Sequence, residues 1–69
     1  MRTTYKYIRF LKLDREYQYD ILNNNNDTLL GHIFWYRPWH QWVFTQAKEN
    51  MVFSKSCLLD IIDFINQLG

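Results

Sequence analysis

Few side chains in this 69-residue sequence could act as catalysts or metal ligands, and they are scattered along the chain. His32 and His40 are its two histidines, and no third ligand stands at a spacing typical of a zinc site. Cys57 could be a nucleophile near a helix N-terminus, where the helix dipole lowers a thiol pKa. Asp60 and Asp63, three residues apart, are the raw material for metal binding or acid catalysis.

Each of these side chains also has a simpler interpretation, which we prefer. The two histidines are interpreted as ordinary surface residues. Cys57 falls on the apolar side of a predicted helix and is expected to be a buried structural thiol, whereas the two aspartates fall on its polar side. Since no nucleophile, base and orienting group can be assembled, we expect a protein that is not an enzyme and uses no metal or cofactor.

The segment 31–42 contains all three tryptophans, both histidines and the only proline. Arg37, Trp39 and His40 in this segment, together with Arg9, could stack on bases and hold phosphates. A formal net charge of +1 releases few counterions, so nucleic-acid binding is the alternative rather than the leading hypothesis.

Length and composition predict one small domain spanning residues 1–69. An aromatic content of 19% compensates for the few core positions, because each ring buries a large area. The single cysteine cannot form an internal disulfide, which favours a reducing compartment, and we expect a cytoplasmic protein. No apolar run approaches the roughly 20 residues that a membrane helix needs, so no membrane partner is expected.

Alternating aromatic and branched residues predict four strands, at about residues 5–13, 17–22, 29–37 and 41–46. Three short connections would join them: a two-residue turn at Asp14 and Arg15, a loop at 23–27, and a turn built on Pro38. Short turns join strands that are neighbours and antiparallel, so the sequence predicts a four-stranded meander.

The last third of the chain changes to a helical period. Ser54 is a good N-cap, and a helix over about 55–68 follows it. An amphipathic helix must bury its apolar side against another element. The predicted fold class is therefore α+β, with one C-terminal helix packed on one face of the sheet.

The predicted turns imply a register for each hairpin. The first would place Phe10 opposite Tyr19, and the second would place Tyr19 opposite Gly31, so that a ring covers the strand glycine. The third would pair Trp35 with Trp42. One face then collects a set of apolar residues that can receive the helix: Ile8, Phe10, Tyr17, Tyr19, Ile21, Leu29, Ile33, Trp35, Trp42 and Phe44.

The reverse face of the predicted sheet is too apolar for a plain solvated surface, and the sequence offers no second helix to cover it. We therefore expect a protein-interaction or self-assembly module, with a homodimer as one form. Its expected binding residues lie on this reverse face: Leu11, Leu30, Phe34, Tyr36 and Val43.

Two strings carry a resemblance to known proteins: GHIFWYRPWHQWVF at residues 31–44, and an F-S-x-S-C-L-L-D-I-I-D-F-I-N-Q-L helix at 53–68. A G-x-I hairpin ending in W-x-F, followed by such a helix, resembles small uncharacterised bacterial, archaeal and phage proteins. That resemblance implies no activity. The topology, strands followed by one helix, is also similar to that of plant ethylene-response-type DNA-binding domains and phage integrase arm-binding domains. Those domains present several Arg and Lys side chains from the sheet face, whereas the reverse face predicted here has only Arg9, beside Asp20.

Overall fold

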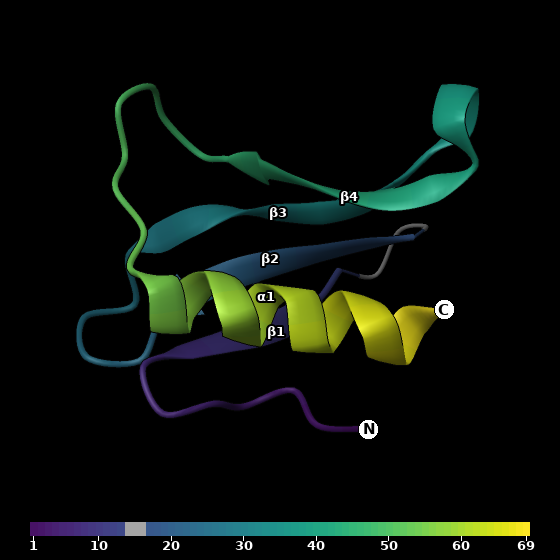
Figure 1. The fold of residues 1–69 in the computed structure, drawn as a ribbon. Helices are drawn as coiled ribbons and strands as arrows, with labels where there is room; N and C mark the ends of the chain where they lie inside the picture. The colour runs from purple at the N-terminus through teal and green to yellow at the C-terminus, as the bar shows by residue number, and fades with distance from the viewer. Residues whose placement is uncertain (14–16) are drawn as a thin grey trace.

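Four antiparallel strands and one α-helix make up the fold in a computed structural model, which describes residues 1–13 and 17–69 (Figure 1). The strands are β1 (Ile8–Lys12), β2 (Gln18–Asn23), β3 (Leu29–Tyr36) and β4 (Gln41–Gln46), and the helix is α1 (Lys55–Leu68). The sheet order β1-β2-β3-β4 follows the chain. The predicted α+β meander with one C-terminal helix is confirmed.

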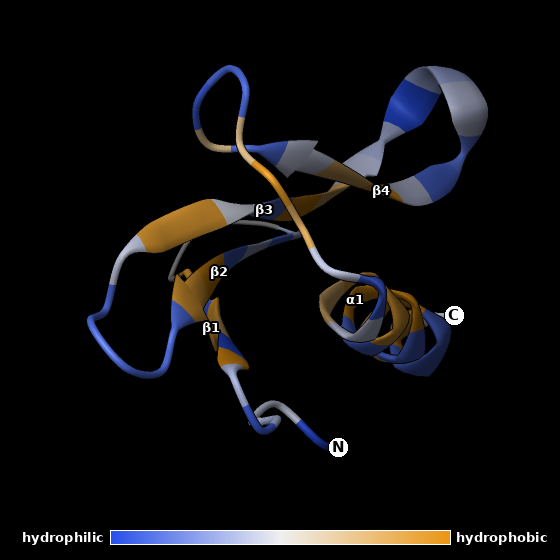
Figure 2. Ribbon diagram, turned by 60° about the vertical axis from the view of Figure 1, so that its left-hand side comes forward, coloured by the Kyte–Doolittle hydropathy of each residue, from blue (hydrophilic) through white to orange (hydrophobic). Residues whose placement is uncertain are grey.

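The helix α1 begins where the sequence predicts it. The extended Ser54 is its N-cap, and the Ser54 Oγ accepts a hydrogen bond from the Cys57 backbone N–H at 3.1 Å, which satisfies a free donor of the first turn. Ile61 and Phe64 are buried against the sheet, Phe64 fully. Figure 2 looks along α1, with the strands on one side of the helix and its hydrophilic residues mainly on the other.

The N-terminal segment does not extend β1 as predicted, because the chain reverses before Ile8. The Tyr5 N–H donates to the Ile8 carbonyl at 2.8 Å, and the Phe10 N–H donates to the Thr3 carbonyl at 2.8 Å. Thr4 pairs with Arg9 in an isolated antiparallel bridge. The first residues therefore fold back along the outer edge of β1, and the predicted strand 5–13 shortens to Ile8–Lys12.

This reversal brings the N-terminus onto the helix, which the sequence did not indicate. The Tyr5 hydroxyl donates to Asp63 Oδ2 at 2.6 Å and accepts from Gln67 Nε2 at 3.1 Å. The Arg2 backbone exchanges two hydrogen bonds of 2.8 Å with the Gln67 side chain. Asp63, predicted to face only solvent, is thus part of the contact that holds the N-terminal segment to α1.

The β3–β4 hairpin has the predicted register. Trp35 pairs with Trp42 and Ile33 pairs with Phe44. The turn around Pro38 is one turn of 3-10 helix over Arg37–Trp39, so β3 ends one residue before the predicted boundary. His40 closes the turn in the left-handed region, with its N–H donating to the Arg37 carbonyl at 3.1 Å.

The other two hairpins are shifted by two residues from the predicted register. Phe10 pairs with Ile21, not with Tyr19, and Ile21 rather than Tyr19 lies opposite Gly31. In the first hairpin, the Leu13 N–H donates to the Gln18 carbonyl at 3.2 Å, so the connection is longer than two residues. The turn predicted at residues 14 and 15 lies outside the described residues.

The second hairpin shifts in two steps. The Asn23 N–H donates to the Thr28 carbonyl at 2.9 Å, which leaves four residues in the loop instead of five. A bulge between the Ile21 and Leu22 pairings then adds one unpaired residue, Leu30, to β3. Since side chains alternate with a period of two, the combined shift of two returns each strand to its predicted face.

The predicted core face is therefore the face that packs on α1. The buried residues are Tyr5, Ile8, Phe10, Ile21, Ile33, Ile61 and Phe64. The core prediction was wrong for three residues, because Tyr17, Leu29 and Trp35 are exposed. Leu29 pairs with Leu22 on the opposite face, and the bulged Leu30 packs against the core in its place.

Candidate functional site

The face of the sheet opposite α1, here called the open face, holds two kinds of residue. Within residues 1–13 and 17–69, there is no second α-helix to cover it. The pairing places twelve residues on it: Arg9, Leu11, Gln18, Asp20, Leu22, Leu29, His32, Phe34, Tyr36, Gln41, Val43 and Thr45. Apolar and aromatic residues therefore share this surface with a few charged and amide side chains.

An aromatic strip runs along β3 on the open face. Phe34 and Tyr36 lie edge to face with ring centroids 6.4 Å apart, and Trp39 continues the strip at 5.0 Å from Tyr36. Val43 pairs with Phe34 on the neighbouring strand, and Leu11 on β1 is 53% exposed. Of the five residues expected to bind a partner, Leu11, Phe34, Tyr36 and Val43 thus share the open face.

Leu30, the fifth expected binding residue, does not lie on the open face. The β3 bulge turns it toward the helix side, where it packs against the core. Its neighbour Leu29 pairs with Leu22 and takes its place on the open face, at its end away from the Arg37–Trp39 turn. A bulge inside a strand has no signal in the alternation of apolar residues, which is why the sequence misassigned these two leucines.

A polar group lies in the middle of the open face. His32 Nδ1 is 2.8 Å from Asp20 Oδ1, and Gln18 Nε2 lies 3.5 Å from the same ring nitrogen. Asp20 and His32 are cross-strand partners, and Thr45 pairs with His32 on its other side. In a neutral His32 ring that donates its Nδ1 proton to the carboxylate, Nε2 is an acceptor, which suits a hydrogen bond to a partner.

The four residues of the nucleic-acid alternative do not form one site. Arg37, Trp39 and His40 lie together in the turn after β3, and Trp39 is 65% exposed. Arg9 is on the opposite edge strand, where its guanidinium contacts Asp27 at 2.5 Å and Asn24 Oδ1 at 3.3 Å. The Arg9 charge is thereby neutralised by the β2–β3 loop and does not join the turn.

Three aromatic rings form a corner at the end of the sheet, on the same side as α1. Trp42 lies edge to face with Trp35, at a centroid distance of 5.8 Å, and with Tyr17, at 6.1 Å. The three rings line an open hollow of about 350 Å³. Sequence reasoning assigned all three to the core. Trp42 does pack against it, whereas Tyr17 and Trp35 are exposed, and the signal that was missed is their place at strand ends, beyond the buried cluster.

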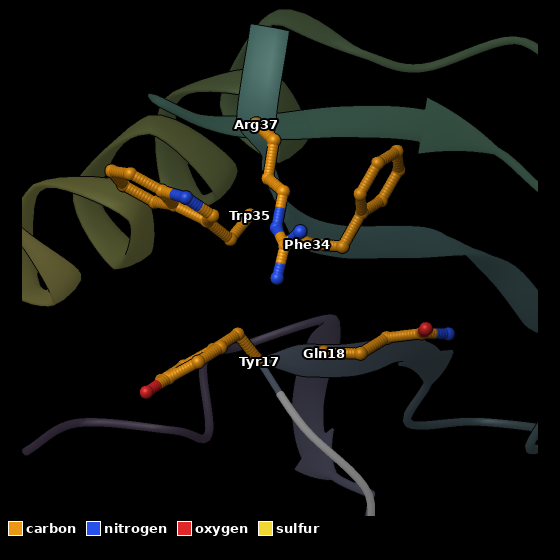
Figure 3. A pocket seen from close by; sticks show the side chains of 5 residues that line it. All are labelled: Tyr17, Gln18, Phe34, Trp35 and Arg37. Atoms are coloured by element: carbon orange, nitrogen blue, oxygen red, sulfur yellow. The ribbon is translucent and has the colours of Figure 1, made fainter. Parts of the chain in front are cut away.

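A second hollow, of about 420 Å³, adjoins the aromatic corner (Figure 3). It is lined by Tyr17, Gln18, Phe34, Trp35 and Arg37. In Figure 3, the Arg37 side chain extends from the turn between Phe34 and Trp35, and its guanidinium ends above the gap between Tyr17 and Gln18. The two hollows share Tyr17 and Trp35, so the corner and the guanidinium form one continuous surface.

The remaining candidate catalytic groups lie apart from these surfaces. Cys57 packs against the core on the helix side, and burial, with a smaller contribution from the charge of Asp60, raises the pKa of its thiol. Within the described ranges, no three His, Cys, Asp or Glu side chains gather closely enough to hold a metal ion. Among the same residues, no helix has the length and apolar character needed to cross a bilayer.

These observations define an α+β protein with a four-stranded meander, one helix-covered face and one open face. The chain is 34% identical over 68 residues to an "Uncharacterized 9.3 kDa protein" of Acholeplasma phage L2, a match that covers 91% of this chain and 85% of the phage protein. The chain belongs to the family of that phage protein. No family model matches it, and no solved structure matches it. The phage protein's name states no activity, so the comparison assigns none.

Proposed function

We propose that this protein is a non-catalytic interaction module whose open face binds a second copy of the chain. One observation carries the proposal: on the face opposite α1, Phe34, Tyr36 and Val43 form a half-buried apolar and aromatic strip, and Leu11 is exposed on β1, across the polar pair of Asp20 and His32. Apolar surface left without a cover is typical of protein interfaces, in which aromatic residues are enriched at the centre.

The charges of the open face support a second copy as the partner. Arg9 is paired with Asp27, and Asp20 is hydrogen-bonded to His32. Since Arg9 and Asp20 each have a partner in their own chain, two copies can meet through this face without leaving either group unpaired. A face-to-face dimer of this kind is isologous, with the same residues contributed by both copies.

The position of the reactive groups supports a non-catalytic role. Cys57 lies on the helix side of the sheet, so the sheet separates it from His32 on the open face. The Asp20 carboxylate contacts the His32 ring and could orient it. The residue that pairs with His32 on strand β4, however, is Thr45, and an unactivated hydroxyl is a weak nucleophile. We also infer a cytoplasmic location, since the only cysteine of the chain is a free thiol.

Sedimentation equilibrium over a concentration series tests the proposal. The wild-type protein is expected to approach the mass of a dimer as concentration rises, whereas Phe34→Asp is expected to weaken the dimer by about 30-fold or more, because a charge is buried in the interface. Val52→Asp is the matched control, because Val52 is 92% exposed and lies outside the open face. The proposal is contradicted if the wild-type protein stays monomeric at every concentration, or if Val52→Asp weakens the dimer as much as Phe34→Asp does.

A further inference from the structure

We propose that the aromatic corner and Arg37 bind one nucleotide unit of a single-stranded nucleic acid, with the base between Tyr17 and Trp35 and its phosphate at the guanidinium. This site lies at the end of the sheet, where its second hollow shares Gln18 and Phe34 with the open face, and it does not rest on self-association. It uses Arg37 and Trp39 from the nucleic-acid alternative, whereas the three rings of the corner, Tyr17, Trp35 and Trp42, are ones that the sequence placed in the core.

The ring angles show that both outer rings of the corner stand steeply on Trp42, and the space between them is here called the slot. The planes of Trp35 and Tyr17 stand at 75° and 77° to the plane of Trp42. Trp42 packs against the core and so forms the floor, while the other two rings rise from it as walls. Figure 3 shows the rings of Trp35 and Tyr17 on either side of the gap, both nearly edge-on to the viewer and inclined to one another. Such a slot offers a stacking surface to a flat ring.

The charge beside the slot selects the chemistry of the ligand. Three aromatic rings alone would also suit a quaternary ammonium group. Arg37, however, lines the adjoining hollow and shares the walls Tyr17 and Trp35 with the slot, so a cation there would be repelled. A flat ring joined to an anion satisfies both parts, and a base joined to a phosphate has this composition. The Gln18 amide in the same hollow offers a donor and an acceptor to a base edge.

A strand fits the site better than a free nucleotide does. Both hollows are open to solvent, so neither blocks the continuation of a polymer. Trp39 leaves the same turn as Arg37 and is 65% exposed, which provides another ring for a neighbouring base. Successive rings with a cation between them are typical of surfaces that bind single strands without sequence preference.

Fluorescence anisotropy with a labelled oligothymidylate at low salt tests the slot. The Tyr17→Ala variant is expected to bind about tenfold more weakly or worse, because one stacking wall is lost. Tyr17 is 70% exposed, so we expect its truncation to leave the fold intact. The matched control is Tyr7→Ala, since Tyr7 is also exposed but lies in the turn before β1, away from the slot. Absence of wild-type binding, or equal losses in the two variants, overturns the proposal.

The Arg37→Gln variant tests the phosphate contact separately. It is expected to reduce the slope of log affinity against log salt by about 0.7, the value for one phosphate contact on a single strand. Thymidine monophosphate is expected to compete with the strand more strongly than thymidine does, and this preference should disappear in Arg37→Gln. A mononucleotide that binds as tightly as the strand overturns the assignment to a strand. If choline binds more tightly than both the strand and the mononucleotide, the corner is a cation site and the proposal is overturned.

Discussion

The ring of Phe10 on β1 lies flat against the ring of Phe64 on α1, with centroids 4.0 Å apart and planes 2° from parallel. Both residues are buried, and the contact joins the edge strand farthest from β4 to the middle of the helix. Because Phe10 and Ile33 share the helix-covered face, Phe34 must lie on the other. This stacked pair therefore determines which side of the sheet is available to a partner.

Truncating the helix side of this contact should destabilise the protein strongly. Phe64→Ala removes a fully buried ring and leaves a cavity, so we expect a loss of about 3–5 kcal/mol in the free energy of unfolding. Ile62→Ala on the exposed side of α1 is the control and should cost far less. Urea denaturation monitored by circular dichroism measures both. Similar losses would mean that the helix packs through a different side.

The contact between Tyr5 and Asp63 should make stability depend on pH in the alkaline range. Burial, and then the hydrogen bond to the Asp63 carboxylate, raise the pKa of Tyr5 from 10.0 to about 12. Below pH 10 the phenol is protonated in both states and the stabilisation is complete. Between pH 10 and 12 the unfolded chain releases this proton first, so stability falls as pH rises.

The Tyr5→Phe variant isolates this effect from the other tyrosines. Urea titrations at a series of pH values should show a steeper alkaline loss of stability in the wild type than in Tyr5→Phe. A direct check is the pH titration of the Tyr5 ring carbon signal by NMR. A midpoint near the ordinary value of 10, or equal pH dependence in the two proteins, contradicts the assignment.

Gly31 should not tolerate a side chain. A Cβ at this position would lie 2.4 Å from the Thr45 carbonyl oxygen and 2.8 Å from Phe44 Cε1. The oxygen belongs to the backbone of the paired strand, so relief requires β3 and β4 to move apart. We expect Gly31→Ala to cost about 1–3 kcal/mol, which thermal denaturation can measure. Asn25→Ala in the exposed loop is the control and should change the melting temperature little. If Gly31→Ala also left the melting temperature unchanged, the β3–β4 hairpin would have to adjust freely to the added Cβ.

Cys57 should react slowly with alkylating reagents in the native protein. Burial is the main cause of its raised pKa, so little thiolate is present at neutral pH. Alkylation by iodoacetamide, followed by mass spectrometry, should be slower than that of free cysteine and should accelerate in denaturant and at higher pH. Reaction faster than that of free cysteine would indicate an activated nucleophile and would contradict the non-catalytic assignment.

The face assignment was predictable from the sequence, although two of the three registers were not. The β3–β4 register was predicted correctly because Pro38 marks a short turn, and this turn places Trp35 opposite Trp42. The other connections offered no such marker. In the second hairpin, the four-residue loop that ends at Asp27, with φ of 58°, and the Leu30 bulge each shift the pairing by one residue. Together the two shifts move the pairing by two residues, so the side chains keep their predicted faces although the predicted register was wrong.

Two features of the candidate sites depended on contacts that sequence periodicity does not encode. Tyr17 and Trp35 alternate in phase with the buried residues, but they lie past the region where the buried cluster ends. The reversal at Tyr5 depends on contacts with Asp63 and Gln67, more than 50 residues away along the chain. Alternation predicts a face, whereas the extent of cover over that face depends on the three-dimensional placement of the helix.

Isotope-filtered NOE spectroscopy on a mixture of labelled and unlabelled protein tests the central claim most directly, because it identifies the residues that meet across a dimer. The predicted result is a set of intermolecular contacts from Phe34, Tyr36 and Val43, with none from Ile62 on the outer side of α1. Intermolecular contacts confined to the helix, or none at a concentration where the dimer forms, would contradict binding through the open face.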